Sequence, residues 1–260
     1  MTDTAAATDA VLTERRDNVL LITLNRPDQR NAVNLDIAEG IAAGLDELDA
    51  DAELQVGILT GAGAGFCAGM DLKAFVTGER PWVGDRGFAG IVQRASRKPL
   101  IAAVEGFAVA GGFEIALACD LIVAAKGAKF GIPEVKRSLV AAGGALLRLQ
   151  QRLPYGLAME MALTGDTMPA ERLHELGAIN ALAEPGSAVD GALELAARIA
   201  PNGPLALDAT KQVLQSARDW TEEEFWAKQG EIAGPVLGSE DAVEGATAFA
   251  EKRAPEWKGR

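Results

Sequence analysis

The sequence predicts an α/β fold with a helical carboxy-terminal part. Short apolar segments alternate with segments of helical period in the first two-thirds of the chain, and from about Tyr155 onward helical patterns follow one another. Repeated strand and helix units that are followed by helices are typical of an α/β core with a helical extension. The chain has no low-complexity linker and no sequence repeat of fixed period.

The first predicted strand lies in VLLITLNRP at 19–27, a run that is rich in Leu and β-branched residues and closes with Asn-Arg-Pro. Residues 34–51 carry apolar side chains close to helical period, which predicts a helix. These apolar positions are Leu35, Ile37, Ile41, Leu45 and Leu48. Two short apolar runs at 55–61 and 99–106 end at glycine and predict buried strands, and the run at 118–125 predicts another.

Strand patterns fade after residue 125, and the rest of the chain is expected to be mainly helical. Four amphipathic helices are predicted from about Tyr155 onward, in the segments 155–165, 169–179, 189–200 and 203–219.

Composition and charge exclude several classes of protein. The chain has 260 residues, of which 48% are hydrophobic, so it can bury a full core. No apolar run approaches the roughly 20 residues of a membrane helix. The start MTDTAAATDA lacks the basic and apolar regions of a secretory signal, so a cytoplasmic protein is expected. The formal net charge of −12 disfavours a nucleic-acid surface, because such surfaces are basic.

Neither a metal site nor a disulfide is expected. Cys67, Cys119 and the single histidine, His174, fit no ligand spacing. His174 lies in a helical pattern beside Glu171 and Glu175, where a solvated surface position is favoured over catalysis. The chain also lacks the G-x-S-x-G motif of a nucleophilic serine.

The Gly-rich stretch GAGAGFCAGMDLK at 61–73 allows a nucleotide-binding interpretation. Gly63, Gly65 and Ala68 satisfy G-x-G-x-x-A after a predicted strand. However, Gly69 breaks the helix that should begin there, and no second strand ends in an acid about 20 residues further on. A nicotinamide site is therefore disfavoured, and a P-loop is excluded because no Gly-Lys-Ser/Thr follows.

Glu114 stands inside the otherwise apolar run EGFAVAGGFEIALACD. Burying an isolated carboxylate costs at least several kcal/mol, so a buried acid needs a partner or a function. Glu114 follows Gly111 and Gly112 at the expected start of a helix, where free N–H groups form an oxyanion receiver. Glu134 follows Pro133 in a predicted loop after another strand. The two acids can act together as base and acid, although a helix-start charge and a solvated loop residue explain each one singly.

Five motifs occur in one order along the chain: VLLITLNRPDQRNAV, GAGAGFCAGMDLK, KPLIAAVEGFAVAGGFEIALACD, KFGIPEV and ALTGD. From about Val19 to the AFAEKR near the carboxy terminus, this set resembles the crotonase family, the enoyl-CoA hydratases and isomerases. The resemblance implies a crotonase-like spiral of strand-strand-helix units at 1–200 and a helical oligomerisation region at 201–260. It also implies a homotrimer or a dimer of trimers, with Trp220, Phe225 and Trp226 as candidate contacts.

The resemblance also implies the catalytic residues. Met70 and Gly111 match the donors of two backbone N–H groups that hold the thioester oxygen of an acyl-CoA, and Glu114 and Glu134 match the two glutamates of the hydratases. Because isomerases and many other members lack one of this pair, we expect a hydratase that converts trans-2-enoyl-CoA to 3-hydroxyacyl-CoA. Glu114 is then expected to activate water and Glu134, with a raised pKa, to donate a proton. The CoA thioester is the substrate, and no metal or redox cofactor is expected.

The remaining predicted site residues would contact CoA or the acyl group. They are Arg30, Ala32, Ala68, Asp71, Leu72 and Lys73, with Lys252 or Arg253 from a neighbouring subunit. After Glu134 the sequence VKRSLVAAGG departs from the apolar pair and glycine that are common in the family. A carnitine-like or bulky acyl-CoA therefore stays open as substrate. Isomerase or dehydratase activity and a non-catalytic acyl-CoA-binding role also stay open.

Overall fold

The structure is a computed structural model that describes residues 10–260. Residues 1–9, on which the argument against a secretory signal depends, lie outside the described residues. No helix in the described part of the chain is both long and apolar enough to cross a membrane.

A six-stranded sheet with the order β1-β2-β3-β6-β8-β11 forms the centre of the core. β1 pairs antiparallel with β2, and the other neighbours pair in parallel. The strands are β1 (Val11–Arg16), β2 (Val19–Leu24), β3 (Val56–Gly61), β6 (Leu100–Val104), β8 (Leu121–Ala125) and β11 (Ala181–Ala183). β2, β3, β6 and β8 are almost wholly buried, as expected for a sheet that helices cover on both faces, and β11 is half-buried.

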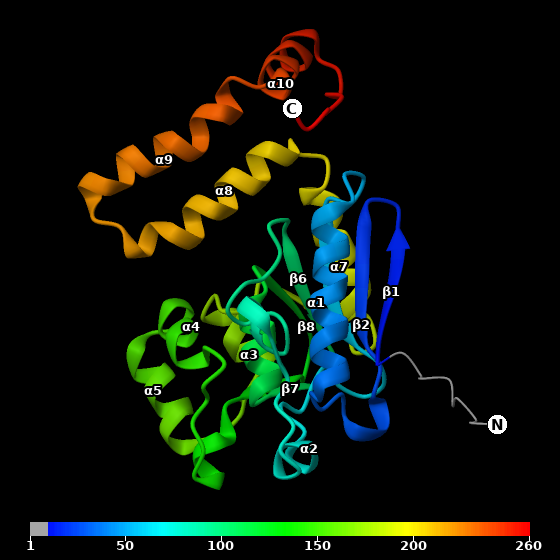
Figure 1. Cartoon of the computed structure of the whole chain (residues 1–260), viewed down its shortest axis with the longest axis vertical. Helices are drawn as coiled ribbons and strands as arrows, with labels where there is room; N and C mark the ends of the chain where they lie inside the picture. Colours follow the sequence, from blue (N-terminus) through cyan, green and yellow to red (C-terminus); the bar gives the residue numbers. More distant parts are fainter. Residues whose placement is uncertain (1–9) are drawn as a thin grey trace, which may run out of the picture.

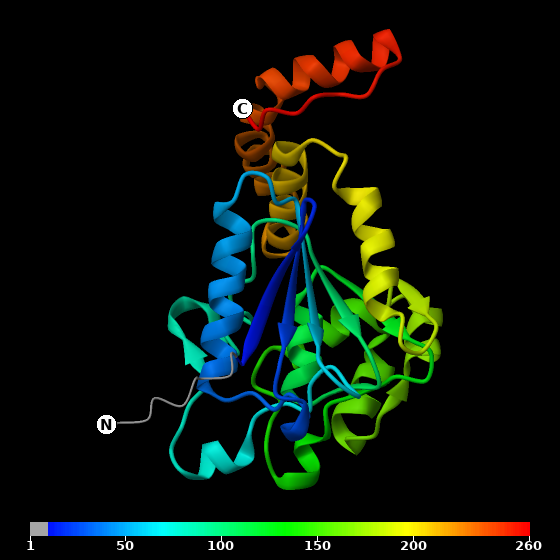
Figure 2. The same ribbon diagram turned by 90° about the vertical axis from the view of Figure 1, so that its right-hand side faces the viewer.

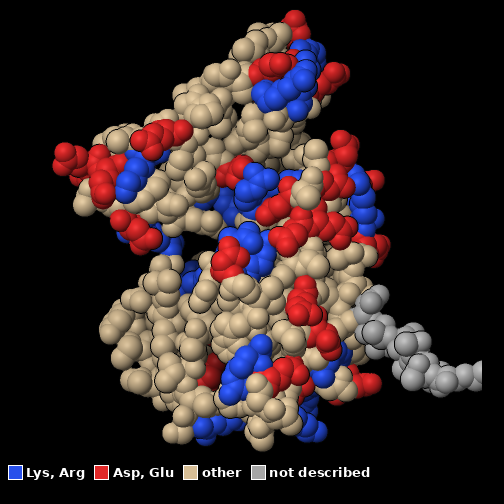
Figure 3. Space-filling view, viewed as in Figure 1, with Lys and Arg blue, Asp and Glu red and all other residues tan. Residues whose placement is uncertain are grey.

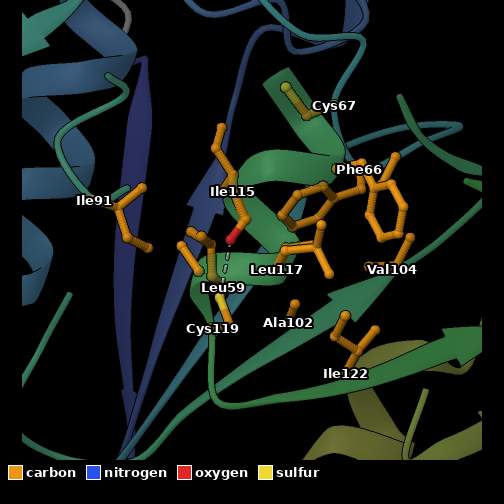
Figure 4. Close-up of a cluster of buried hydrophobic side chains, with 14 of the residues drawn as sticks. Leu59, Phe66, Cys67, Ile91, Ala102, Val104, Ile115, Leu117, Cys119 and Ile122 are labelled. Carbon is orange, nitrogen blue, oxygen red and sulfur yellow. Dashed lines mark hydrogen bonds between the residues drawn. The ribbon is translucent and has the colours of Figure 1, made fainter. Parts of the chain in front are cut away.

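Helices cover the two faces of this sheet, with α1 on one side and α7 on the other (Figure 2). The covering helices are α1 (Leu35–Ala50), α3 (Gly111–Ala118) and α7 (Ala188–Ile199). α1 begins where the Asn34 side chain accepts a hydrogen bond from the Ile37 N–H. Figure 4 shows Ile115 and Leu117 of α3 packed with Leu59 and Val104 of the strands.

A second, three-stranded sheet with the order β10-β9-β7 lies beside the first and carries the segments that lead to Glu114 and Glu134. Its strands are β7 (Phe107–Val109), β9 (Lys129–Gly131) and β10 (Met168–Pro169), and a separate hairpin is formed by β4 (Trp82–Val83) and β5 (Gly87–Phe88). The remaining helices of the core are α2 (Leu72–Val76), α4 (Ala145–Arg152), α5 (Tyr155–Thr164) and α6 (Ala170–Glu175). Short 3₁₀ turns are η1 (Pro27–Gln29), η2 (Gly84–Arg86), η3 (Pro133–Arg137) and η4 (Ala217–Asp219).

The last three helices project away from the sheet (Figure 1). They are α8 (Pro204–Ser216), α9 (Glu222–Leu237) and α10 (Glu240–Glu251). α8 and α9 form an antiparallel hairpin, and both views place it beyond one end of the strands (Figures 1 and 2).

The last third of the chain is mainly helical, as expected, but two of its features differ from the prediction. A strand, β11, lies between the helical segments and extends the main sheet, because Ala181, Leu182 and Ala183 pair in parallel with β8. Three residues are too short to show strand periodicity in the sequence. The helix expected over 169–179 covers only Ala170–Glu175, and Ala178 and Ile179 lie buried in the turn that follows it.

Candidate active site

The register of β7 and β9 brings the two candidate acids to the same edge of the second sheet. These parallel neighbours pair Val109 with Gly131, and the Ala110 N–H donates to the Gly131 carbonyl at 2.8 Å. Glu114 follows its strand by five residues and Glu134 by three. Because parallel strands end at the same edge, acids that are 20 positions apart in sequence leave the sheet together.

Helix α3 begins in a tightly packed backbone turn. Ala110, directly before the helix, has φ +52° and ψ −132°, a conformation that costs a residue with a Cβ of order 1–3 kcal/mol. A Cβ at Gly112 would lie 2.2 Å from the Cys67 carbonyl oxygen, and one at Gly111 would lie 2.7 Å from the Phe88 ring. The two glycines are therefore required by close approach.

Glu114 is 4% exposed, in the first turn of α3. The Ala145 N–H donates to its Oε1 at 3.1 Å. Burial raises the pKa of Glu114 to about 7, and the charge of Glu134 adds to the rise, while the backbone N–H of Ala145 and the Arg148 guanidinium oppose it. Near neutral pH, Glu114 is therefore divided between its two protonation states.

Glu134 is placed by η3, so the expected loop is a short 3₁₀ turn that begins at Pro133. Its Oε2 is buried and has no hydrogen-bond partner among the described residues. Burial raises the pKa of Glu134, against a backbone hydrogen bond and the nearby Arg137. A buried carboxylate oxygen without a donor favours the protonated acid, which can give a proton to a bound molecule.

The backbone amides of Met70 and Gly111 lie close to each other. A Cβ placed on Gly69 would lie only 2.9 Å from the Gly111 nitrogen. The residues on either side of Met70 form backbone hydrogen bonds with Val33. The Val33 N–H donates to the Gly69 carbonyl, and the Asp71 N–H donates to the Val33 carbonyl. The Met70 N–H therefore points away from Val33.

Neither amide donates a hydrogen bond within the described part of the chain. Gly111 is the first residue of α3, so its N–H has no acceptor inside the helix. Two adjacent free N–H groups can hold one developing negative oxygen.

Asn31 and Arg26, which the sequence analysis missed, hold the loops around these amides. The fully buried Asn31 accepts from the Arg26 N–H and donates to the carbonyls of Ala62 and Gly65. The Arg26 guanidinium donates to the Ala32 carbonyl at 2.6 Å and pairs with Asp71 at 3.2 Å. Asn-Arg-Pro predicted only a turn, because the partners of these side chains come from a distant Gly-rich segment.

The structure gives Asp71 a structural role. Its carboxylate caps α2 by accepting from the N–H groups of Lys73 and Ala74, and it pairs with Arg26. These donors outweigh the burial and lower the pKa of Asp71. The carboxylate is thus already occupied by partners in the protein.

The other predicted CoA contacts are distributed around the same loops. Ala68 N–H donates to the Arg30 carbonyl at 3.0 Å, which brings the exposed Arg30 beside the Gly-rich segment. Ala32 and Ala68 are half-buried, and Leu72 and Lys73 are exposed in the first turn of α2.

The two candidate cations near the carboxy terminus, Lys252 and Arg253, differ in their contacts within the chain. Lys252 is exposed at the end of α10. Arg253 binds Glu244 and Glu251 of its own chain, and these acids raise its pKa.

Two hollows lie away from the glutamates. One, of about 410 Å³, separates α8 from α9 and is lined largely by apolar residues. The other, of about 1230 Å³, lies between α8 and the core and has charged side chains in its wall, as Figure 3 shows from one side. Neither is lined by Glu114 or Glu134, so the candidate site is defined by its chemical groups and not by the size of a cavity.

Comparison with known proteins identifies the family. The family model described as enoyl-CoA hydratase/isomerase matches residues 14–260. The chain belongs to the enoyl-CoA hydratase/isomerase family. Its crotonase-like fold, which the sequence predicted, is confirmed by solved structures of this family. Enoyl-CoA hydratase EchA1 from Mycobacterium marinum superposes with a TM-score of 0.95 at 57% identity, over 97% of this chain and 100% of that one.

Relatives in the family carry two kinds of name. Enoyl-CoA hydratase EchA19 of Mycobacterium tuberculosis is 43% identical over 96% of each chain. Carnitinyl-CoA dehydratase of Salmonella arizonae is 42% identical over 94% of this chain and 97% of its own. A solved carnitinyl-CoA hydratase from Mycobacterium avium is 44% identical, covers 97% of this chain and 99% of its own, and superposes with a TM-score of 0.77.

Proposed function

We propose that this chain is an enoyl-CoA hydratase that adds water to a trans-2-enoyl-CoA and forms a 3-hydroxyacyl-CoA. The observation that carries the proposal is the arrangement of two acids with raised pKa values, Glu114 and Glu134, beside a pair of unbonded amides. Hydration needs one carboxylate to take a proton from water and one carboxylic acid to supply a proton to carbon. The relatives named enoyl-CoA hydratase support the same reaction.

In the proposed first step the thioester oxygen lies between the N–H groups of Met70 and Gly111. These donors withdraw electron density from the conjugated alkene, so its β-carbon becomes electrophilic. Since α3 starts at Gly111, the positive end of the helix also faces the oxygen that gains negative charge. Only the backbone of Met70 is needed, and its side chain is free to shape the acyl pocket.

The proposed second step transfers two protons. Ionised Glu114 takes a proton from water while the water oxygen bonds to the β-carbon and the alkene electrons move onto the thioester oxygen. The enolate then collapses as protonated Glu134 gives its proton to the α-carbon. The product has gained one water, Glu114 holds a proton and Glu134 is ionised, and exchange with solvent restores both groups.

Binding of CoA is proposed to use the exposed cations near the amides. Arg30 and Lys73 flank the loops that carry Met70, so they can receive phosphate groups. Lys252 is kept as a candidate from a neighbouring subunit. Arg253 is less suited to this role because Glu244 and Glu251 already neutralise it. No cofactor is proposed beyond the CoA thioester itself, and a cytoplasmic location is proposed for the chain.

Dehydration of a substituted 3-hydroxyacyl-CoA is the second candidate function. The relatives named carnitinyl-CoA dehydratase favour it, and the same acids and amides would run the reaction in reverse. The η3 turn weighs against a cationic acyl group, because it carries Lys136 and Arg137, and of these two only Lys136 has an ion-pair partner among residues 10–260, namely Asp166. An uncharged acyl group fits this surface better.

We also propose a homotrimer or a dimer of trimers, held by the projecting helices. Large apolar side chains remain strongly exposed on α8–α10 of the single chain. They are Leu214, Trp226, Leu237, Val243 and Phe249, with exposed fractions of 66–87%. The rings of Trp220, which precedes α9, and Phe225 of α9 have centroids 6.3 Å apart, and both residues are half-buried. Apolar area of this kind is typical of a subunit contact.

Sedimentation at micromolar concentration tests the proposed assembly. A species of three or six chains is expected, and a monomer would rule the assembly out.

A turnover assay across enoyl-CoA esters of increasing size tests the proposed function. We expect loss of the conjugated thioester absorbance with 2-enoyl-CoA and formation of the 3-hydroxyacyl product. Parallel reactions with a 3-enoyl-CoA and with carnitinyl-CoA separate an isomerase and a dehydratase from a hydratase. Tight binding of every ester without turnover would indicate a non-catalytic acyl-CoA-binding protein.

A further inference from the structure

A glycine turn lies directly against the Glu114 carboxylate. The Ala145 N–H donates to Oε1 at 3.1 Å, and a Cβ on Gly143 would lie 2.5 Å from Oε2. The turn therefore contacts both carboxylate oxygens. Gly144 has φ +100°, a left-handed conformation that favours glycine. Any shift of this turn would change the donors that orient Glu114.

Arg148 lies on the other side of the same turn. A Cβ on Gly144 would lie 2.2 Å from the Arg148 Nη1, so the guanidinium is packed against the turn backbone. The Arg148 Nη2 donates to the Val92 carbonyl at 2.6 Å, and its Nη1 donates to the Gly143 carbonyl at 3.5 Å. The turn is thus held between a carboxylate and a guanidinium.

The charges that face Glu114 come from two elements. Glu134 on η3 favours the protonated form of Glu114, whereas Arg148 on α4 favours the ionised form. The backbone N–H groups of Gly143 and Ala145 also favour the ionised form. A cation at Arg148 therefore opposes the two effects that protonate Glu114, namely burial and the second acid.

We propose that Arg148 is a positioning residue for the hydration reaction, because it fixes the Gly143–Ala145 turn against Glu114 and supplies a positive charge behind it. Arg148 itself does not touch the substrate in this proposal. The inference rests on the proposed function for its kinetic consequence, but its effect on Glu114 is a property of the protein alone.

Arg152 provides a matched control. It lies four residues further along α4, is half-buried like Arg148, and donates to the carbonyls of Leu117 and Cys119 at 3.1 and 2.8 Å. Burial lowers the pKa of Arg152, and the charged groups with the largest effects on it are Asp120, Arg148 and Arg218. Replacing Arg152 removes the same charge from the same helix without changing the contact to the glycine turn.

The experiment compares Arg148→Gln, Arg148→Lys and Arg152→Gln in the full-length protein. Infrared spectra across neutral pH follow the carbonyl stretch of protonated Glu114, which is assigned by its loss in Glu114→Gln. Steady-state hydration of 2-butenoyl-CoA gives kcat and KM over the same pH range. Circular dichroism and melting curves establish that each variant is folded.

For Arg148→Gln we expect the Glu114 titration midpoint to move above about 7 and kcat to fall roughly 10- to 100-fold, the size of loss that misplacement of a reacting group produces. KM should change much less, because Arg148 makes no contact with substrate. Arg148→Lys should return the midpoint toward that of the wild type and recover part of kcat. Arg152→Gln should leave the midpoint where it is.

The proposal is overturned if Arg148→Gln moves the midpoint no further than Arg152→Gln. It is also overturned if Arg148→Lys is as impaired as Arg148→Gln. Should Arg148→Gln not fold, Arg148→Met replaces it as the uncharged variant and is compared with Arg148→Lys, and a Glu114 midpoint that Met leaves at the wild-type value contradicts the proposal. If the wild type hydrates no 2-enoyl-CoA, the proposed function fails, whereas the infrared midpoints still test Arg148.

Discussion

Helices α3 and α9 both carry a glutamate in their first turn, yet the two acids have opposite properties. Glu114 in α3 is buried, and its pKa is raised to about 7. Glu224 in α9 is exposed, and hydrogen bonds from Thr221 and Lys228 lower its pKa to about 2. The helix dipole has the same sign at both starts and favours ionisation in each. At Glu114, burial therefore raises the pKa more than the helix dipole lowers it. At Glu224, surface hydrogen bonds and the helix dipole both lower the pKa.

The two helix starts also differ in how they are capped. Thr221 and Glu224 form a reciprocal capping box, in which each side chain binds the backbone N–H of the other residue. Ala110 supplies no side-chain cap to α3, and the Gly111 N–H stays free. A capped helix start stabilises the fold, whereas a free one can bind a ligand.

The largest effect is expected from removing the acids at the candidate site. Glu114→Gln and Glu134→Gln should each lower the hydration rate by roughly 100- to 10,000-fold, the span for a positioned acid or base. Steady-state kinetics with a 2-enoyl-CoA measures this, with circular dichroism to monitor folding. Glu224→Gln is the matched control and should hydrate at the wild-type rate. Near-normal turnover in either site variant would refute the two-carboxylate mechanism.

Removing the Gly111 N–H tests the free helix start. Gly111→Pro should lower the rate by roughly 100- to 1,000-fold relative to Gly111→Ala, because only proline deletes the donor. Both replacements place a Cβ close to Phe88, so the alanine variant isolates the donor from that steric effect. The comparison uses kcat/KM and the melting curves of both variants. Equal rates in two folded variants would mean that this amide is not part of an oxyanion site.

The two acids should make opposite contributions to stability as pH changes. Glu114 has a pKa above its ordinary value of 4.5, so between pH 4.5 and about 7 the folded protein holds a proton that the unfolded chain has released. The free energy of unfolding therefore falls by about 3 kcal/mol as pH rises from 4.5 to about 7. Glu114→Gln should remove this loss. Glu224 has a lowered pKa, so its contribution is present above pH 4.5 and disappears as pH falls toward 2.

Denaturant melts of the wild type, Glu114→Gln and Glu224→Gln at several pH values measure how the free energy of unfolding changes with pH. A Glu114→Gln variant with the same pH dependence as the wild type between pH 4.5 and 7 would contradict the burial argument.

The smallest effects concern the two caps. Thr221→Ala should lower the free energy of unfolding by about 1 kcal/mol because it deletes the capping side chain. Ala110→Gly should raise it by less than about 1 kcal/mol, since relief of the positive φ is partly offset by the greater freedom of glycine in the unfolded chain. Thermal unfolding compares the two. If Ala110→Gly were the destabilised variant, the Ala110 backbone would not be strained.

The sequence alone predicted the α/β core, the long helix that follows Asn34, and strands within 19–27, 55–61 and 99–106, where the structure has strands at 19–24, 56–61 and 100–104. These elements were predictable because periodicity and caps are local properties of the chain. Ordered motifs also predicted the family, which the comparisons confirm. The roles of Met70, Gly111, Glu114 and Glu134 stay predictions.

Only the tertiary structure decided what surrounds those residues. The β7–β9 register aligns Glu114 with Glu134, and β11 joins the sheet although its three residues show no pattern. Asn31, Arg26 and Arg148 gain their roles from partners that lie 31, 45 and 56 positions away, at Ala62, Asp71 and Val92. The raised pKa of Glu114 likewise comes from burial, which depends on how distant segments pack around it. Local sequence sets backbone propensity, but contacts and desolvation are properties of the whole folded chain.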